Sequence, residues 1–245
     1  MAREHSKTCT QGHVAPDAFV LDGADECVRH YPNCAVYHRP MDSSSTELTA
    51  FVLAGGKSTR MGADKAFKEL DGRTLLARAL ELARSVTLDV RIVGDPAKFA
   101  PYAPVVEDIF RGCGPLAGIH AALRATKTEL NLILAVDVPF VSPALLQYLT
   151  KRARDSAATV TVAQAGGGWQ PLCAVYRREF ADAAEQSLRA GRYKIDALFE
   201  GARTELITEE ELESAGFSQK MFRNLNAREE LEAASGRKSC EAKES

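Results

Sequence analysis

Several features are missing from this sequence, and each absence narrows the class of protein. No apolar run approaches the roughly 18 residues that a membrane span needs, and the chain begins with polar Met1-Ala-Arg-Glu-His rather than a signal peptide. No block of about five or six like charges, as a nucleic-acid-binding arm would require, interrupts the balance of 31 basic and 33 acidic residues. We therefore expect a soluble cytoplasmic protein that binds neither membrane nor nucleic acid.

The cysteines show no tight repeat, so a disulfide framework is not expected and a reducing compartment fits better. Cys27, His30, Cys34 and His38 have spacings of three to four residues, which leaves a zinc site open, but no Cys-x2-Cys pair is present and the pattern matches no common zinc module. The alternative is that Met41 is the true start. We assign residues 1–47 to a disordered extension.

From Leu48 onward, short β-branched apolar runs alternate with segments of helical period, which is typical of βα units and a mostly parallel sheet. The predicted strands span residues 49–53, 90–93, 104–107, 132–136, 159–163, 172–176 and 204–207. The predicted helices span residues 74–84, 116–125, 142–154, 179–190, 194–200, 209–215 and 227–234. The pattern indicates one α/β domain over residues 48–235, a three-layer α/β/α sandwich with a Rossmann-like sheet, followed by a disordered tail over 236–245.

A glycine-rich basic loop follows the first predicted strand, because residues 53–66 read Leu-Ala-Gly-Gly-Lys-Ser-Thr-Arg-Met-Gly-Ala-Asp-Lys-Ala. Open α/β sheets bind ligands at the carboxyl ends of their strands. Gly55 and Gly56 allow close approach of the backbone, whose N–H groups can cradle phosphate oxygens. Lys57, Arg60 and Lys65 add cations that suit a triphosphate. A glycine turn with solvated charges is the alternative.

Two familiar phosphate-binding motifs are excluded at this loop. A Walker A loop ending at Gly56-Lys57-Ser58 needs glycine where Phe51 stands, and the dinucleotide fingerprint fails because Gly55-Gly56 is followed next by Gly62. The loop is therefore neither a P-loop nor a dinucleotide-binding fingerprint.

The run from Leu53 to Ala66 closely resembles the molybdenum cofactor guanylyltransferases, which attach GMP to molybdopterin using GTP and magnesium. Three later segments extend the resemblance over about residues 48–234: Glu107-Asp108 leading into Gly114-Pro-Leu-Ala-Gly118, Val136-Asp-Val-Pro-Phe140, and Phe222-Arg-Asn-Leu-Asn-Ala-Arg-Glu-Glu-Leu231. The resemblance implies a fold of the nucleotide-diphospho-sugar transferase type. It also implies that the chain releases pyrophosphate while making molybdopterin guanine dinucleotide.

Asp137 is the first candidate ligand for magnesium, because it follows the apolar run at residues 132–136 and so lies at a strand's carboxyl end. The resemblance assigns this position to the metal, although an Asp that caps the turn before Pro139 is the alternative. Asn226 is a second metal candidate by resemblance, but it also fits the N-cap of the last predicted helix. The resemblance places Asp108 near the guanosine, and Gly114 to Gly118 would supply a helix start facing the ligand.

The second substrate has weaker candidates. Trp169 to Cys173 follow Gly166-Gly-Gly168, which we expect to be a flexible loop able to clasp that substrate, although Trp169 alternatively packs the loop. The resembled family usually has His where Gln170 stands. Arg189, Arg192 and Lys194 are candidates for contacts to phosphates and pterin, or only an exposed helix end.

These expectations define one site and its alternatives. The catalytic residues are expected to be Arg60, Lys65 and Asp137, with magnesium held by Asp137 and Asn226; the nucleotide-binding residues are expected to be Leu53, Ala54, Gly55, Gly56, Lys65, Asp108 and Asp137. The implied partners are GTP, molybdopterin, and molybdoenzymes or their chaperones.

Three other functions stay open at this point. Related CTP-dependent cytidylyltransferases tend to read Leu-Ala-Ala-Gly, so Gly55 and Asp64-Lys65-Ala66 favour guanine. Another small-substrate nucleotidyltransferase, such as one for sugar 1-phosphates, and a non-catalytic cofactor carrier are the broader alternatives.

Overall fold

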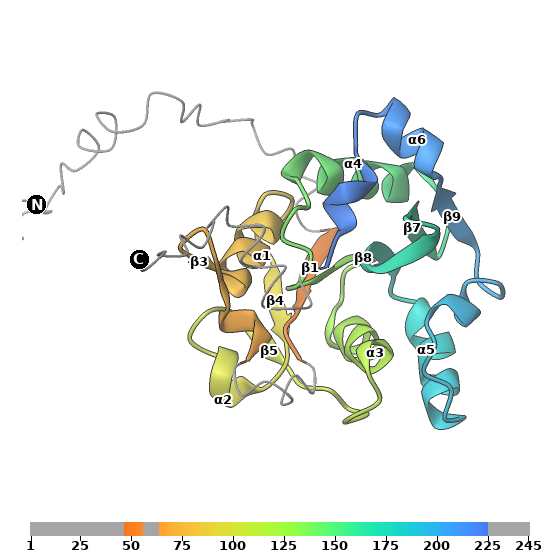
Figure 1. Cartoon of the computed structure of the whole chain (residues 1–245). Helices are drawn as coiled ribbons and strands as arrows, with labels where there is room; N and C mark the ends of the chain where they lie inside the picture. Colours follow the sequence, from red (N-terminus) through yellow and green to blue (C-terminus); the bar gives the residue numbers. More distant parts are fainter. Residues whose placement is uncertain (1–46, 56–63, 225–245) are drawn as a thin grey trace, which may run out of the picture. The chain divides into compact units, whose positions relative to one another are not determined.

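The computed structural model describes residues 47–55 and 64–224 of the chain (Figure 1). The predicted extension up to residue 46, the predicted helix 227–234 and the tail 236–245 lie outside the described residues. Within the described ranges, no helix is long and apolar enough to cross a membrane.

A seven-stranded sheet forms the centre of the fold, in the order β5-β4-β1-β6-β8-β7-β9. Its strands are β1 (Leu48–Leu53), β4 (Val90–Val93), β5 (Val105–Val106), β6 (Leu130–Ala135), β7 (Val160–Ala165), β8 (Gly168–Arg177) and β9 (Thr204–Ile207). Every pair is parallel except those of β8, which runs antiparallel to both β6 and β7. All seven predicted strands and the mostly parallel sheet are confirmed.

Helices cover both faces of this sheet, as the three-layer prediction requires (Figure 1). The helices are α1 (Leu75–Arg84), α2 (Pro96–Phe99), α3 (Pro115–Ala125), α4 (Pro143–Asp155), α5 (Phe180–Arg189) and α6 (Glu209–Ser214). Short 3-10 turns are η4 (Lys65–Phe67), η5 (Asp196–Leu198) and η6 (Gln219–Phe222), and a small hairpin joins β2 (Glu69–Leu70) to β3 (Arg73–Thr74).

The side-chain alternation of β1 divides the core between the two layers. Ala50 and Val52 pack in one apolar cluster with α1, α4 and α6, whereas Phe51 and Leu53 pack in the other with α3 and α5. Every residue of β1 and β6 is buried, because helices cover both faces of these parallel strands. Such strands read as continuous apolar runs, and this is why the sequence located them.

Side-chain caps begin two of the predicted helices. Ser142 Oγ accepts the backbone N–H of Leu145 at 3.2 Å ahead of α4, and Thr208 with Glu211 forms a complete capping box ahead of α6. These bonds satisfy helix N–H groups that have no partner within the helix.

Two predicted segments differ in the structure. The helix predicted at 194–200 is only the 3-10 turn η5. Unlike the similarly short α6, its start has no side-chain cap. The loop predicted at 166–168 is a two-residue hairpin turn: Gly166 and Gly167 both have positive φ (61° and 73°), and Gly168 already begins β8. The prediction of a flexible loop here was wrong.

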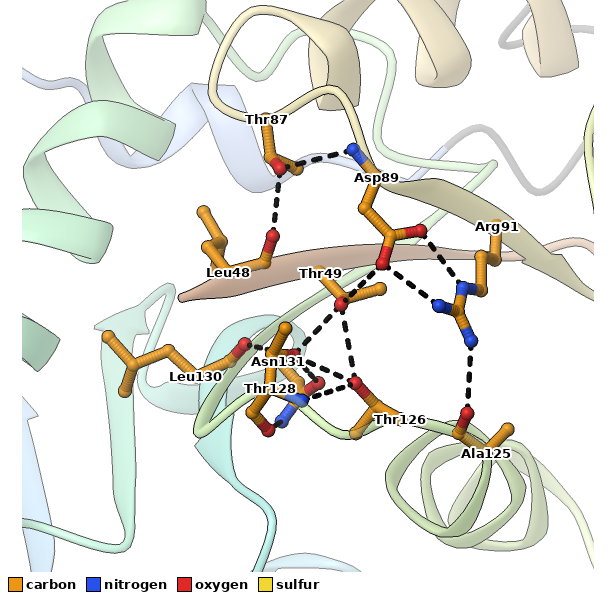
Figure 2. A network of polar contacts seen from close by, with 10 residues as sticks. All are labelled: Leu48, Thr49, Thr87, Asp89, Arg91, Ala125, Thr126, Thr128, Leu130 and Asn131. Atoms are coloured by element: carbon orange, nitrogen blue, oxygen red, sulfur yellow. Dashed lines mark hydrogen bonds and ion pairs between the residues drawn. The ribbon is translucent and has the colours of Figure 1, made fainter. Parts of the chain in front are cut away.

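A polar network lies at the amino ends of β1, β4 and β6, opposite the ends where ligands bind open sheets (Figure 2). Thr49, which is fully buried, donates to Asp89 Oδ2 at 2.9 Å and lies 2.8 Å from Thr128 Oγ1. Arg91 donates to both carboxylate oxygens of Asp89, at 2.9 Å each. Burial alone would raise the pKa of Asp89, but the hydrogen bonds from Arg91 and Thr49 outweigh it and lower the pKa.

Candidate active site

A pocket of about 200 Å³ opens at the carboxyl ends of β1, β4 and β6. Its wall contains six of the predicted nucleotide-binding and catalytic residues, which come from four separate stretches of the chain. The full lining is Leu53, Ala54, Gly55, Asp64, Lys65, Val93, Asp108, Gly114, Pro115, Gly118, Ala135, Val136, Asp137 and Leu172. The predicted residues Gly56, Arg60 and Asn226 lie outside the described residues.

The end of β1 forms the floor of the pocket. The backbone N–H groups of Ala54 and Gly55 both donate to the carbonyl of Val93, at 3.1 and 3.2 Å. The Gly55 N–H, which was expected to bind phosphate, therefore makes a strand-end hydrogen bond in this structure. A Cβ at Gly55 would lie 3.7 Å from both Gly94 Cα and Val93 O, which is ordinary contact. The fold itself therefore leaves room for a side chain there.

Lys65 and Asp137 form an ion pair inside the pocket, with Nζ 2.8 Å from Oδ2. Lys65 is the first residue of η4, and Asp137 follows the end of β6 by two positions. The side chains are 18% and 22% exposed, so solvent screens the pair only in part. Asp137 therefore faces the lysine of the predicted phosphate loop rather than only capping the turn before Pro139.

Asp108 lies just beyond β5 and carries a polar atom to which no described residue donates a hydrogen bond. Its Oδ1 is buried and accepts no hydrogen bond from the residues that the structure describes. Burial raises the pKa of this carboxyl. Leaving a buried acceptor unsatisfied is costly, so the arrangement suits a ligand that brings a donor. Asp108 also borders a second cavity with Gly55, Gly94 and Asp95.

The start of α3 forms the side of the pocket next to Asp108. Gly114 precedes the helix with φ 75°, a conformation that favours glycine, and Pro115 is its first residue. A Cβ at Gly118 would lie 3.7 Å from Asp108 Oδ1 and 3.4 Å from a methyl group of Leu53. The predicted turn and helix start are confirmed, and they bring the backbone at Gly118 close to Asp108 Oδ1.

The segment predicted to contact the second substrate is an irregular part of β8. Val162 pairs with Ala174 but Gln164 pairs with Trp169, so β8 bulges between these pairs. The Gln170 amide donates to the Ala165 carbonyl at 2.9 Å. Gln170 thus satisfies the backbone of the hairpin, and Leu172 is the residue of this segment that lines the pocket.

Two other candidates for the second substrate pack against the protein itself. Trp169 lies 5.1 Å from the ring of Phe199, which agrees with the alternative that it packs the loop. Arg189 donates twice to Glu185 on its own helix α5, at 2.9 and 2.7 Å, and lies over the ring of Phe110.

Asp64 and Lys98 were not among the predicted site residues, although Asp64 belongs to the motif that favours guanine. Asp64 lines the pocket and caps η4, because its Oδ1 accepts the backbone N–H of Ala66 at 3.2 Å. Its Oδ2 lies 3.0 Å from the Lys98 ammonium on α2. The Asp directly before the 3-10 turn is a local capping signal that sequence reasoning can use, whereas nothing local links it to a lysine 34 positions away.

Comparisons with known proteins agree with this geometry. The family model of the MobA-like NTP transferase domain matches residues 50–206. A molybdenum cofactor guanylyltransferase of Desulfosudis oleivorans is 36% identical over 190 residues, which cover 76% of this chain and 94% of that protein. A probable molybdenum cofactor guanylyltransferase of Pelotomaculum thermopropionicum is 33% identical over 187 residues, covering 76% and 90%.

Solved structures share the fold. Molybdopterin-guanine dinucleotide biosynthesis protein A from Archaeoglobus fulgidus superposes with a TM-score of 0.67 at 28% identity, covering 76% of this chain and 96% of that chain. A 2-C-methyl-D-erythritol 4-phosphate cytidylyltransferase from Thermus thermophilus has a TM-score of 0.57 at 21% identity, covering 77% and 97%, and shows the fold alone.

Proposed function

Since this chain belongs to the MobA-like NTP transferase family and, within it, to the molybdenum cofactor guanylyltransferases, we propose that it transfers GMP from GTP to molybdopterin and releases pyrophosphate. One observation supports this proposal most directly. Lys65 and Asp137, from distant parts of the sequence, form an ion pair with Nζ 2.8 Å from Oδ2, beside the end of β1. A phosphate-binding cation next to a metal-binding carboxylate is what nucleotidyl transfer needs.

The phosphates would lie along the floor made by Leu53, Ala54 and Gly55, with Lys65 as the contact that neutralises them. Lys65 contacts Asp137 in the free protein, so nucleotide binding exchanges this ion pair for a lysine–phosphate contact. Arg60, from the part of the loop outside the described residues, is proposed as a second phosphate-binding cation.

The base would lie toward Asp108. Its buried Oδ1 accepts no hydrogen bond from the described residues, and a carboxylate offers only acceptors. Guanine presents adjacent N–H donors on its Watson–Crick edge, which a carboxylate can accept. Cytosine presents a single amino group there, so a contact that uses both oxygens of Asp108 would favour GTP over CTP.

Magnesium fits the donor chemistry of the pocket. Asp137 supplies a carboxylate oxygen, which magnesium prefers together with phosphate oxygens and water. Within the described residues, no group of three or more His, Cys, Asp or Glu side chains is arranged to hold a metal; the nucleotide phosphates are proposed as further ligands of the ion. When bound, the ion would stabilise negative charge that develops on the phosphates. Asn226, outside the described residues, is the second proposed ligand.

The reaction needs no covalent bond to the protein. A terminal phosphate oxygen of molybdopterin attacks the α-phosphorus of GTP, the new P–O bond forms, and the bond to the β-phosphate oxygen breaks as pyrophosphate leaves. Lys65 and Arg60 then act by holding the phosphates in line and by neutralising the charge on the leaving group. Positioning and charge stabilisation supply most of the acceleration in phosphoryl chemistry.

Purified protein incubated with molybdopterin, magnesium and either GTP or CTP tests the proposal. The expected result is molybdopterin guanine dinucleotide and equimolar pyrophosphate with GTP only. Exclusive use of CTP would show a cytidylyltransferase instead. Tight binding of molybdopterin without pyrophosphate release from either nucleotide would indicate a carrier.

A further inference from the structure

Helix α2 contacts the segment that carries Lys65 at two points. Just before η4, the Lys98 ammonium lies 3.0 Å from Asp64 Oδ2. At the carboxyl end of η4, the ring of Phe99 stacks on the ring of Phe67, with ring centroids 5.7 Å apart and ring planes 22° apart. Because η4 spans Lys65–Phe67, these contacts hold both of its ends to the same short helix.

Asp64 connects the first of these contacts to the phosphate-binding lysine. One carboxylate oxygen accepts the backbone N–H of Ala66 and so caps η4, while the other binds Lys98. Two hydrogen bonds to different groups restrict the Asp64 side chain to one orientation. The Asp64 carboxylate therefore connects the backbone that carries Lys65 to Lys98 on α2.

Helix α2 is itself anchored, so Lys98 extends from a fixed support. Phe99 is buried, and its ring packs so closely on Gly94 that a Cβ there would lie 2.8 Å from it. The Gly94 N–H donates to the Val106 carbonyl at 3.0 Å, which joins the end of β4 to β5. Lys98 thus links η4 to the edge of the sheet.

Charge gives Lys98 a second effect on the pocket. Asp64, Asp108 and Asp137 all line the space proposed for a triphosphate, and each carboxylate would repel a polyanion. Lys65 neutralises Asp137 and Lys98 neutralises Asp64. The hydrogen bond to Asp64 also raises the pKa of Lys98.

We propose that Lys98 is a positioning residue for nucleotide binding, which holds Asp64 as the cap of η4, directs Lys65 into the pocket and cancels the Asp64 charge. This inference rests on the proposed function. Lys98 is half exposed, at 52% of its side chain, and exposed ion pairs have small energies. Loss of the pair should therefore weaken triphosphate binding only by roughly two- to fivefold.

A double-mutant cycle tests whether Lys98 acts through Asp64. The variants are Lys98→Met, Asp64→Asn, their combination, and Lys98→Arg, which keeps the charge. The readouts are the dissociation constant for GTP with magnesium by calorimetry, KM and kcat for GMP transfer, and the melting temperature. Lys127→Met is the matched control, because Lys127 is exposed before the amino end of β6, away from the pocket.

The expected results separate positioning from stability. Lys98→Met should raise both the dissociation constant and KM for GTP, change kcat less, and leave the melting temperature unchanged. Lys98→Arg should bind GTP nearly as well as the wild type. In the Asp64→Asn background, Lys98→Met should add no further loss, because the partner charge is already absent.

Other outcomes overturn the inference. Unchanged GTP affinity in Lys98→Met would do so, as would an equal loss in the wild-type and Asp64→Asn backgrounds, or an equal loss in Lys127→Met. The dissociation constants of the cycle are measured with whichever of GTP and CTP the wild-type protein binds. A wild-type protein that binds nucleotide but transfers no GMP would therefore contradict the proposed function without affecting this test.

Discussion

The Lys65 ammonium lies 2.8 Å from the Asp137 carboxylate, although 72 positions separate the two residues along the chain. Strands β1 and β6 are parallel neighbours, with Leu53 opposite Ala135, so their ends bring the glycine-rich segment beside Asp137. In the proposed reaction these same two side chains bind phosphate and magnesium. The ion pair of the free protein therefore competes with the contacts of the bound state.

The first prediction concerns metal binding without nucleotide. Lys65→Met should increase the affinity of the free protein for Mn²⁺, used as a spin probe for magnesium, by about tenfold, because it removes a cation that competes for Asp137. The same variant should bind GTP more weakly. Electron paramagnetic resonance titration of Mn²⁺ measures the first effect, and calorimetry measures the second.

Asp137→Asn in the Lys65→Met background is the control for this metal prediction, since it should remove the gained Mn²⁺ affinity. Equal Mn²⁺ binding by the wild type and Lys65→Met would mean that the lysine does not compete for the site.

The second prediction concerns catalysis. Asp137→Ala and Lys65→Ala should each reduce GMP transfer by at least about 100-fold, since each removes a charge proposed to act on the phosphates. Both side chains are partly exposed, so we expect circular dichroism spectra like that of the wild type and melting temperatures within a few degrees of it. Full activity in either variant, measured by pyrophosphate release, would contradict the proposed catalytic role of that residue.

The third prediction separates stability from nucleotide choice at Gly55. The nearest atoms to an added Cβ are 3.7 Å away, so Gly55→Ala should leave the melting temperature unchanged. Related cytidylyltransferases tend to have alanine at this position, so GTP affinity should fall relative to CTP affinity. Competition binding of the two nucleotides measures the ratio. A large loss of stability with no change in this ratio would show that glycine is needed for the fold.

The fourth prediction concerns acid stability and the polar network of Figure 2. The pKa of Asp89 is lowered in the folded protein, so the unfolded chain binds the proton more readily as pH falls. Asp89 therefore stabilises the fold at neutral pH, and this contribution is lost as pH falls below the ordinary value of 3.8 and through the lowered pKa. Because 40% of its side chain is exposed, solvent screening limits the contribution to about 1 kcal/mol.

Urea unfolding of Asp89→Asn and wild-type protein across this pH range measures the difference. The free energies of unfolding should differ at pH 7 and converge in acid. A difference that stays constant down to the lowest pH would show that the charge of Asp89 does not contribute.

Sequence patterns predicted the elements whose signals are local or strongly apolar. Strand β6 is buried along its whole length and reads as a continuous apolar run from Leu132 onward, so the strand end before Asp137 could be placed to within a few residues. The turn of the small hairpin, Asp71-Gly72, has positive φ at both residues and carries a recognisable Asp-Gly signal, yet strands of only two residues give too little alternation to predict. The helix predicted at 194–200 was wrong, because an apolar period was read as a helix where no side chain caps the start.

By itself, the sequence determined the α/β class, the order of the strands along the chain, and which residues stand at the strand ends: Gly55, Asp108 and Asp137. These follow from apolar runs and from turn and capping residues, which act over a few positions. Only the tertiary structure decided the contacts among them. The order of strands in the sheet brings Lys65 beside Asp137, and the packing of α2 brings Lys98 beside Asp64. The burial of Asp108 Oδ1, to which no described residue donates, likewise depends on the folded neighbours. Such contacts depend on which strands become neighbours, and no local pattern encodes that choice.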